Sequence, residues 1–340
     1  MPQAAVPSYI GQDFNDAPPG HRFGLYFSCW QPDWTMEPDP KKAEEKSKKG
    51  KLAALKRAAA LDRYSQAQLK ELRQRQQAVA ATLSETVFSW PATSIAPFMT
   101  GTGMEHPLEN GFAFLNPYGL PYLPGSGVKG VLRRAAEELV SKDDGDPQGW
   151  NQHAIDVLFG RETEPGDTEI ARNRGALMFW DVIPEPAGDK LAVDIMTPHY
   201  SDYYQGNTTP HDSGQPNPIL FLAIPPGSRF EFFVQCESIL LPEALRQKWR
   251  TLLEAAFRHA FDWLGFGAKT AVGYGQLRTA IEKAHAEHAK IAEERRAQAA
   301  QATLSPEQKI LAELQDWFKK DQAAKRKEPG GRLAMHLRDL

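Results

Sequence analysis

The strongest periodic pattern of apolar positions lies in residues 242–265. Apolar side chains recur there at spacings of three and four, which predicts an amphipathic helix with a buried stripe. The stripe consists of Leu245, Trp249, Leu252, Leu253, Ala256, Phe257, Ala260, Phe261 and Leu264. Residues 126–140 predict a second helix that the segment KDDGDPQG ends, and residues 150–158 predict a short third one. These helices supply apolar faces for a core.

Short β-prone runs alternate with the helices. Residues 22–30 and 175–184 each predict a strand, and residues 86–99, with two prolines, predict an edge or irregular strand. Residues 216–225 and 229–235 flank the turn PPGS and predict a hairpin. The order strand, helix, strands, helix, strand fits a ferredoxin-like α+β unit, a fold on which RNA-recognition sheets are built.

The pattern divides the chain into four parts. Residues 1–40 form an N-terminal segment with the first strand, residues 86–280 the ferredoxin-like domain, and residues 281–340 a helical C-terminal extension. Residues 41–85 contain no proline and favour helix. Their apolar stripe is thin, so we expect a helical insertion outside the core. The stripe consists of Leu52, Leu55, Leu61, Leu69 and Leu72.

Charge is unevenly distributed. The formal net charge of −3 does not indicate a nucleic-acid-binding protein, but residues 41–75 hold twelve Lys or Arg against four acidic residues. That insertion is either a solvated surface helix or a basic face that meets RNA or an acidic neighbour. RNA contacts elsewhere must come from a localised groove.

Composition excludes several classes of protein. With 340 residues, 41% hydrophobic and 24% charged, the chain is typical of a soluble globular protein. No apolar run approaches the ~20 residues of a membrane span, and the first twenty residues do not resemble a secretory signal, so we expect a cytoplasmic protein. Cys29 and Cys236 have no CxxC partners, which argues against zinc and against a disulfide. We expect no metal and no cofactor.

The most distinctive motif is the glycine-rich stretch GFGAKTAVGYG. It departs from the mononucleotide P-loop, which needs Gly where Ala268 and Trp263 stand. It is either an anion cradle, in which backbone N–H groups approach a phosphate, or a tight connection with an incidental lysine. The candidate RNA-binding residues of this loop are Gly265, Gly267, Lys269, Thr270, Gly273, Tyr274 and Gly275.

A second glycine-rich stretch, LPGSGVKGVLRR, starts the predicted helix at residue 126. Lys129 and Arg133 are four apart and share a helical face, near a start whose free N–H groups favour an anion. Gly125, Ser126 and Arg134 complete the candidate RNA contacts of this stretch.

At these two stretches the chain resembles the RAMP superfamily, the RNA-binding subunits of CRISPR effector complexes. Three further stretches resemble the sixth-subunit family of type III-B (Cmr) effectors: GTGMEHPLENG from Gly101, DIMTPHYSDYY from Asp194 and PNPILFLAIPPG from Pro216. The resemblance covers residues 85–280. It implies a ferredoxin-like RAMP fold with the glycine loop near the sheet.

The resemblance also implies a function. It is that of a non-catalytic subunit of a ribonucleoprotein that holds the 3′ part of the crRNA and its complementary target RNA in antiviral defence. The implied protein neighbours are the repeating backbone RAMP subunit, the small helical subunit and another terminal RAMP subunit. Lys129, Arg133 and Lys269 would then hold the RNA backbone.

Two alternatives to this function stay open. A RAMP-type metal-independent endoribonuclease that processes CRISPR RNA would need an acid–base pair, and the loop residues His106, His199 and His211 match no catalytic spacing. His199 and Tyr200 instead suit stacking with bases or packing against another subunit. A structural adaptor whose loops hold protein is the second alternative. Asp143, Asp144 and Asp146 read as a solvated turn, and Asp181 as a buried orienting carboxylate.

Overall fold

The computed structural model describes residues 3–34, 46–108, 110–140, 149–161, 174–197 and 218–279. Residues 1–281 form one compact unit. The helical extension expected from residue 281 lies outside the described residues, and the four-part division of the chain stays a prediction.

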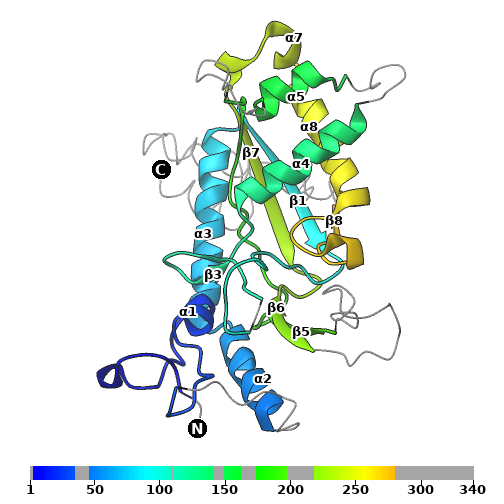
Figure 1. The fold of residues 1–340 in the computed structure, drawn as a ribbon. Coiled ribbons are helices and arrows are strands. Elements are labelled where there is room, and N and C mark those ends of the chain that lie inside the picture. Colours follow the sequence, from blue (N-terminus) through cyan, green and yellow to red (C-terminus); the bar gives the residue numbers. More distant parts are fainter. Residues whose placement is uncertain are drawn as a thin grey trace, which may run out of the picture. The chain divides into compact units, whose positions relative to one another are not determined.

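The centre of this unit is an antiparallel sheet with the strand order β4-β7-β1-β8 (Figure 1). Helix α4 (Gly125–Leu139) joins β1 to the β4 side, and α8 (Trp249–His259) joins β7 to β8. The strands are β1 (Val87–Ser94), β4 (Leu177–Phe179), β7 (Arg229–Cys236) and β8 (Leu277–Thr279). This βαββαβ order with its central pair of strands is the ferredoxin-like α+β arrangement, so the predicted fold class is confirmed.

Helices α4 and α8 contact each other and cover one face of the sheet (Figure 1). Trp90 and Phe232 are paired across β1 and β7, and both point to this side. The rings of Trp90 and Phe257 stack with centroids 5.4 Å apart, and Phe232 meets Phe257 edge-on at 5.5 Å. The predicted apolar stripe of α8 is thus buried against the sheet.

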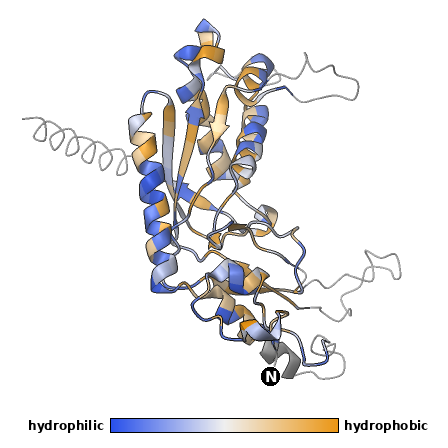
Figure 2. Cartoon of the chain, turned by 90° about the vertical axis from the view of Figure 1, so that its left-hand side faces the viewer, coloured by the Kyte–Doolittle hydropathy of each residue, from blue (hydrophilic) through white to orange (hydrophobic). Residues whose placement is uncertain are grey.

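The opposite face of the sheet is covered by α3 (Arg63–Thr82). Figures 1 and 2 place α3 on the far side of the strands from α4 and α8. The Gln77 amide on α3 donates a hydrogen bond of 2.7 Å to the carboxylate of Glu231, which points away from α8. The sheet face that many RNA-recognition domains leave open is therefore partly occupied by the chain itself.

The helices of the insertion belong to the core. Helix α2 (Lys46–Ala59) and α3 bring Leu55, Leu61 and Leu69 into the same apolar cluster as the sheet residues. Asp62 caps α3 by accepting a 2.6 Å hydrogen bond from the Ser65 N–H. The expectation that these helices lie outside the core is wrong, because small alanines beside the leucines widen the buried stripe. These alanines are Ala54, Ala58 and Ala59.

Strand β1 is central, not at an edge. Pro91 is tolerated there because it lies just beyond the residues of β1 that pair with β8, which are Ala92–Ser94. Its carbonyl, which points to that side, accepts a hydrogen bond from the hydroxyl of Thr279. The missing N–H of the proline therefore removes no bond from the sheet.

The predicted hairpin around PPGS is also wrong. Strand β6 (Ile219–Ala223) pairs with β5 (Ala192–Met196) in a separate two-stranded sheet, whereas β7 pairs with β1 and β4. The chain crosses between the sheets at Ser228, which is buried and donates its N–H to the hydroxyl of Ser94 at 3.1 Å.

Smaller elements complete the unit. The predicted strand at residues 22–30 is wrong, because helix α1 (Pro19–Gly24) includes its first residues. The rings of Phe23 and Phe27 pack against His106 there. The predicted long helix is split into α7, α8 and a π-helical turn. The remaining elements are η1 (Ser8–Ile10), β2 (Phe114–Leu115), β3 (Leu120–Pro121), α5 (Gln152–Phe159), η3 (Ser238–Leu240), α7 (Glu243–Arg246), η4 (Ala260–Leu264) and η5 (Thr270–Val272).

Candidate nucleic-acid interface

The glycine-rich loop connects the π-helical turn η4 to strand β8. Its four glycines all have positive φ angles. At Gly275 a Cβ atom would lie 1.8 Å from the Phe266 carbonyl oxygen, and at Gly267 it would lie 2.2 Å from that of Met99. Any other residue at these two positions would displace the backbone, so the glycines fix the path of the loop.

Backbone hydrogen bonds hold the loop at both ends. The Phe266 N–H donates to the Gly275 carbonyl at 3.0 Å and closes the loop on itself. The N–H groups of Ala268 and Gly275 donate to the carbonyls of Met99 and Pro97, each at 2.8 Å. The loop is therefore anchored to the segment that follows β1, directly before the motif at Gly101.

A side-chain contact ties the loop to the β5–β6 sheet as well. The Tyr274 hydroxyl donates to the Asp194 carboxylate at 2.7 Å, and its ring meets Phe221 edge-on. Burial, followed by the hydrogen bond to Asp194, raises the pKa of Tyr274 to about 12. The tyrosine hence stays a donor at neutral pH, and stretches distant in sequence converge at the loop.

The tip of the loop presents backbone amides. Lys269 has φ 58° and ψ 34°, a left-handed conformation, and Thr270 directly begins the right-handed turn η5. Within the described part of the chain, the consecutive N–H groups of Lys269, Thr270 and Ala271 have no hydrogen-bond partner. A left-handed residue followed by a right-handed one aims successive N–H groups into a shared concavity, which suits an anion.

The second glycine-rich stretch is used differently. The Gly125 N–H at the start of α4 donates to the Asp181 carboxylate at 2.7 Å. Asp181 is exposed, so the expectation that it is buried is wrong. Its carboxylate occupies the position where the sequence suggested an external anion, and it is favoured there by the helix dipole. A Cβ at Gly125 would lie 2.2 Å from the Phe179 carbonyl oxygen, so this glycine serves close packing of α4 on β4. Ser126 is exposed in the first turn.

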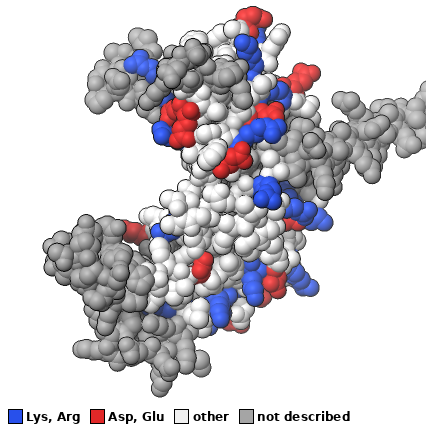
Figure 3. Space-filling view, turned by 90° about the vertical axis from the view of Figure 1, so that its right-hand side faces the viewer, with Lys and Arg blue, Asp and Glu red and all other residues white. Residues whose placement is uncertain are grey.

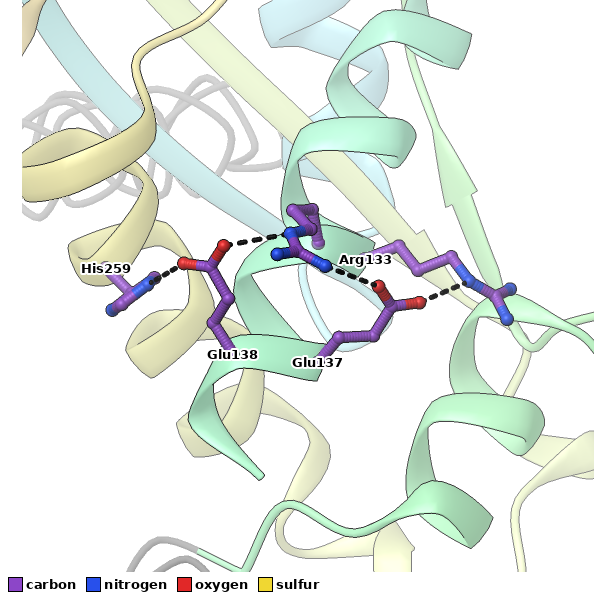
Figure 4. Close-up of polar contacts among 5 residues, drawn as sticks. Arg133, Glu137, Glu138 and His259 are labelled. Atoms are coloured by element: carbon purple, nitrogen blue, oxygen red, sulfur yellow. Dashed lines mark hydrogen bonds and ion pairs between the residues drawn. The ribbon is translucent and has the colours of Figure 1, made fainter. Parts of the chain in front are cut away.

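The two arginines of α4 take part in a chain of ion pairs (Figure 4). Arg133 is only 15% exposed, and it donates to Glu137 at 3.1 Å and to the Gly160 carbonyl at 2.6 Å. Arg134 is exposed but pairs with Glu138 at 2.8 Å, and Glu138 also meets His259 of α8 at 2.8 Å. These pairs join α4 to α8, so the two arginines have internal partners that an RNA phosphate would have to replace.

Lys129 and Lys269 differ from these arginines. Both are half-buried, and neither forms an ion pair with another described residue. On the side of the molecule shown in Figure 3, basic and acidic side chains are intermixed. A nucleic-acid contact on this surface would therefore depend on local geometry more than on a broad positive field.

An exposed tryptophan next to the loop was not identified from the sequence. Trp263 in η4 is 76% exposed, and Val272 in η5 is exposed as well. Trp263 is not part of the predicted apolar stripe of residues 242–265. Its place outside the stripe is the feature of the sequence that could have predicted its exposure. An exposed indole beside unpartnered amides suits stacking with a base or contact with a protein surface.

The histidines divide into two groups. The His106 ring accepts the Leu108 N–H at Nδ1, contacts the Phe23 carbonyl through Nε2, and stacks on the Phe23 ring at 3.8 Å. Burial lowers the pKa of His106. Because both nitrogens are used, His106 has a structural role here. His199, Tyr200 and His211 lie outside the described residues.

The described residues contain neither a candidate metal site nor a candidate membrane span. They hold no cluster of three or more His, Cys, Asp or Glu suited to a metal ion. Among those residues no helix is both long and apolar enough to cross a membrane. The acidic loop at residues 143–146 lies outside them.

Comparison with known proteins gives consistent matches. Residues 92–278 match the model of the RAMP superfamily. The CRISPR system Cmr subunit Cmr6 of Pyrococcus furiosus is 31% identical over 225 residues, which is 53% of this chain and 64% of that protein. Cmr6 of Saccharolobus solfataricus is 27% identical over 128 residues, or 37% of this chain and 36% of that one. The chain thus spans less than two thirds of the length of the curated relatives it matches.

Solved structures are also similar. The Type III-B Cmr-beta complex bound to cognate target RNA, seen by cryo-EM, contains a chain with a TM-score of 0.49 and 20% identity, covering 72% of this chain and 77% of that one. The crystal structure of Cmr6 from Pyrococcus furiosus gives a TM-score of 0.33 at 27% identity, covering 57% and 97%.

Proposed function

The chain belongs to the RAMP superfamily, and on that premise we propose that it is an RNA-binding subunit of a type III-B CRISPR (Cmr) effector. It holds the 3′ part of the crRNA and its target duplex in the cytoplasm during antiviral defence. The names of the two curated relatives support this assignment. Its protein partners are the repeating backbone RAMP subunit, the small helical subunit and the other terminal RAMP subunit.

The observation that carries the proposal is the tip of the glycine loop. Three consecutive amides, from Lys269 to Ala271, have no hydrogen-bond partner in the described part of the chain, and Lys269 itself adds a positive charge to the loop. Backbone N–H groups and a lysine are the donors that proteins use to hold phosphate oxygens without reading sequence. The loop is anchored on three sides, so it reaches a phosphate already ordered and little entropy is lost on binding.

The remaining candidate residues fall into two classes. Gly265, Gly267, Gly273 and Gly275 shape the loop, while Thr270, Tyr274 and Lys129 stay proposed RNA contacts at its surface and on α4. Arg133 and Arg134 contact RNA only if they exchange their glutamate partners for phosphate. We place them second to Lys269 for that reason.

The subunit is proposed to be non-catalytic. A general base needs a nitrogen that is free to take a proton, and both ring nitrogens of His106 are engaged. Cleavage of target RNA by the assembly would then come from another subunit.

The test uses paired lysine substitutions. Asn tolerates the left-handed conformation, so Lys269→Asn removes the charge with little backbone strain. Lys248→Asn makes the same chemical change at an exposed lysine beside the start of α8, at the end of the helix away from the loop. RNA affinity is measured for each full-length chain at several salt concentrations.

We expect Lys269→Asn to weaken single-stranded RNA binding about tenfold and to make the salt dependence shallower by roughly 0.7 in log–log slope. Lys248→Asn should change neither quantity. Equal effects of the two lysine variants, or no effect of Lys269→Asn, would show that the loop is not the RNA site.

A further inference from the structure

A polar cavity lies in the N-terminal part of the unit, and its described lining includes no residue of the glycine loop. Its volume is about 550 Å³, within the range of small-molecule sites. The N-terminal segment, α1 and α2 contribute its walls. The residues that matter for its chemistry are Gln3, Gln12, Phe14, Asn15, Arg22, Tyr26 and Arg57.

Arg22 is a buried cation that makes no direct ion pair among the described residues. Arg22 is 9% exposed, and its guanidinium nitrogen Nη2 donates a hydrogen bond to the Ala60 carbonyl. Its Nε is buried without a partner, and among the described residues no acceptor meets Nη1. Asp62 is near enough to favour the charged form, but burial has the larger effect and lowers the pKa of Arg22. A buried guanidinium that is only partly compensated in this way is costly unless an anion joins it.

Arg57 adds a second guanidinium to the same cavity. It lies on the exposed side of α2 and donates to the Ser28 hydroxyl at 2.7 Å, which holds the side chain along the wall. No Asp or Glu occurs among the described residues that line the cavity. The cavity therefore carries two positive charges and no negative one.

The other wall is aromatic and amide-bearing. The rings of Phe14 and Tyr26 stack on each other at 4.2 Å with an angle of 5° between their planes. Such a flat pair offers an outer π-face to a base. The Gln12 amide already bonds the backbone of Ala4, and the Asn15 amide donates to Asp13, so a ligand would use the remaining hydrogen-bonding positions of these amides. Paired guanidinium groups hold a phosphate through several parallel N–H···O bonds.

We propose that this cavity binds a nucleoside phosphate, with the phosphate between Arg22 and Arg57 and the base against the Phe14–Tyr26 pair. A carboxylate would satisfy the guanidinium groups but would leave the aromatic wall without a role. The nucleotide is either free or part of an RNA strand.

The test titrates the full-length chain with adenosine 5′-monophosphate, adenosine and inorganic phosphate by calorimetry. We expect the monophosphate to bind more tightly than adenosine or phosphate alone. Arg57→Gln should weaken the monophosphate about tenfold. Arg63→Gln, the matched control, removes an exposed arginine of the next helix that contacts Tyr64 outside the cavity, and should leave binding unchanged. Thermal melting shows that each variant is folded.

Competition distinguishes the two sources of the nucleotide. A 5′-phosphorylated ten-nucleotide RNA is added to the Lys269→Asn chain, so that the glycine loop contributes little. Displacement of the monophosphate by this RNA supports an RNA strand as the ligand, and failure to displace it supports a free nucleotide. No binding of the monophosphate at millimolar concentration, equal weakening by both arginine variants, or tighter binding of a glutamate octapeptide would overturn the proposal. None of these results depends on whether the glycine loop binds RNA.

Discussion

The packing of α2 into the core leads to a quantitative prediction. Leu55 is 0% exposed and lies in the same apolar cluster as Trp90 of the sheet. Truncating a fully buried leucine to alanine costs about 2–5 kcal/mol, from lost burial and from the cavity left behind. Leu52 lies one turn earlier on the same helix and is half-exposed. Leu52→Ala should therefore cost less than about 1 kcal/mol.

The assay compares the two variants by urea and thermal unfolding, with total tryptophan fluorescence, to which the buried Trp90, Trp150 and Trp249 contribute, as the signal. For domains of 150–250 residues, 1 kcal/mol shifts Tm by roughly 2–4 °C. Leu55→Ala, at about 3 kcal/mol, should then melt roughly 6–12 °C below the wild type. A similar m-value in urea would show that the compactness of the unfolded state is unchanged.

Equal melting temperatures of the two variants would refute the packing of α2 into the core. If Leu55→Ala and Leu52→Ala melt within about 1 °C of each other, α2 does not contribute to the core and the packing described above is incorrect. A Gly/Ser linker in place of residues 46–85 extends the argument. This linker would remove Leu55, Leu61 and Leu69 together and uncover one face of the sheet. We therefore expect the linker variant to show no cooperative unfolding transition.

Two further predictions concern the loop and the α4–α8 contact. Gly275→Ala should destabilise the unit far more than Gly273→Ala, since only the former places a Cβ against backbone, and urea unfolding of both variants measures the difference. Two bonds from His259 and Arg134 lower the pKa of Glu138 below its usual 4.5, so its contribution to stability is present above that value and is lost as pH falls through the lowered pKa. The stability difference between wild type and Glu138→Gln should accordingly shrink in acid, and a constant difference from pH 7 to pH 3 would contradict this.

The order of helices and strands could be read from the sequence, because periodicity reports burial along one element. The stripe of α8 and the start of α4 are examples, and together they predicted the ferredoxin-like arrangement. Strand partners could not be read in this way. Residues 219–223 and 229–236 look like one hairpin, yet each finds its partner far along the chain, and only tertiary packing decides between the two pairings.

The candidate site shows the same division. The glycines of the loop predicted an unusual backbone, and the structure adds the left-handed Lys269 that orients three amides. Charge alone misled at α4, since a sequence does not show that Asp181 reaches the Gly125 N–H or that Glu137 pairs with Arg133. Basic residues near the start of a helix predict an anion site only when no carboxylate of the same chain already accepts hydrogen bonds from its N-terminal N–H groups.

The pairing of β1 with β8 has a consequence for biosynthesis. Residues 92–94 pair with residues 277–279, so β1 has no partner on that side until almost the whole unit has been translated. At about 5–20 residues per second, that interval lasts on the order of 10–40 s. For most of this interval the nascent chain carries Trp90 without Phe257 and Phe261, the aromatic side chains that cover it in the folded unit. We therefore expect the yield of folded chain in a cell to depend on translation speed and on holding chaperones more than on the stability of the finished unit.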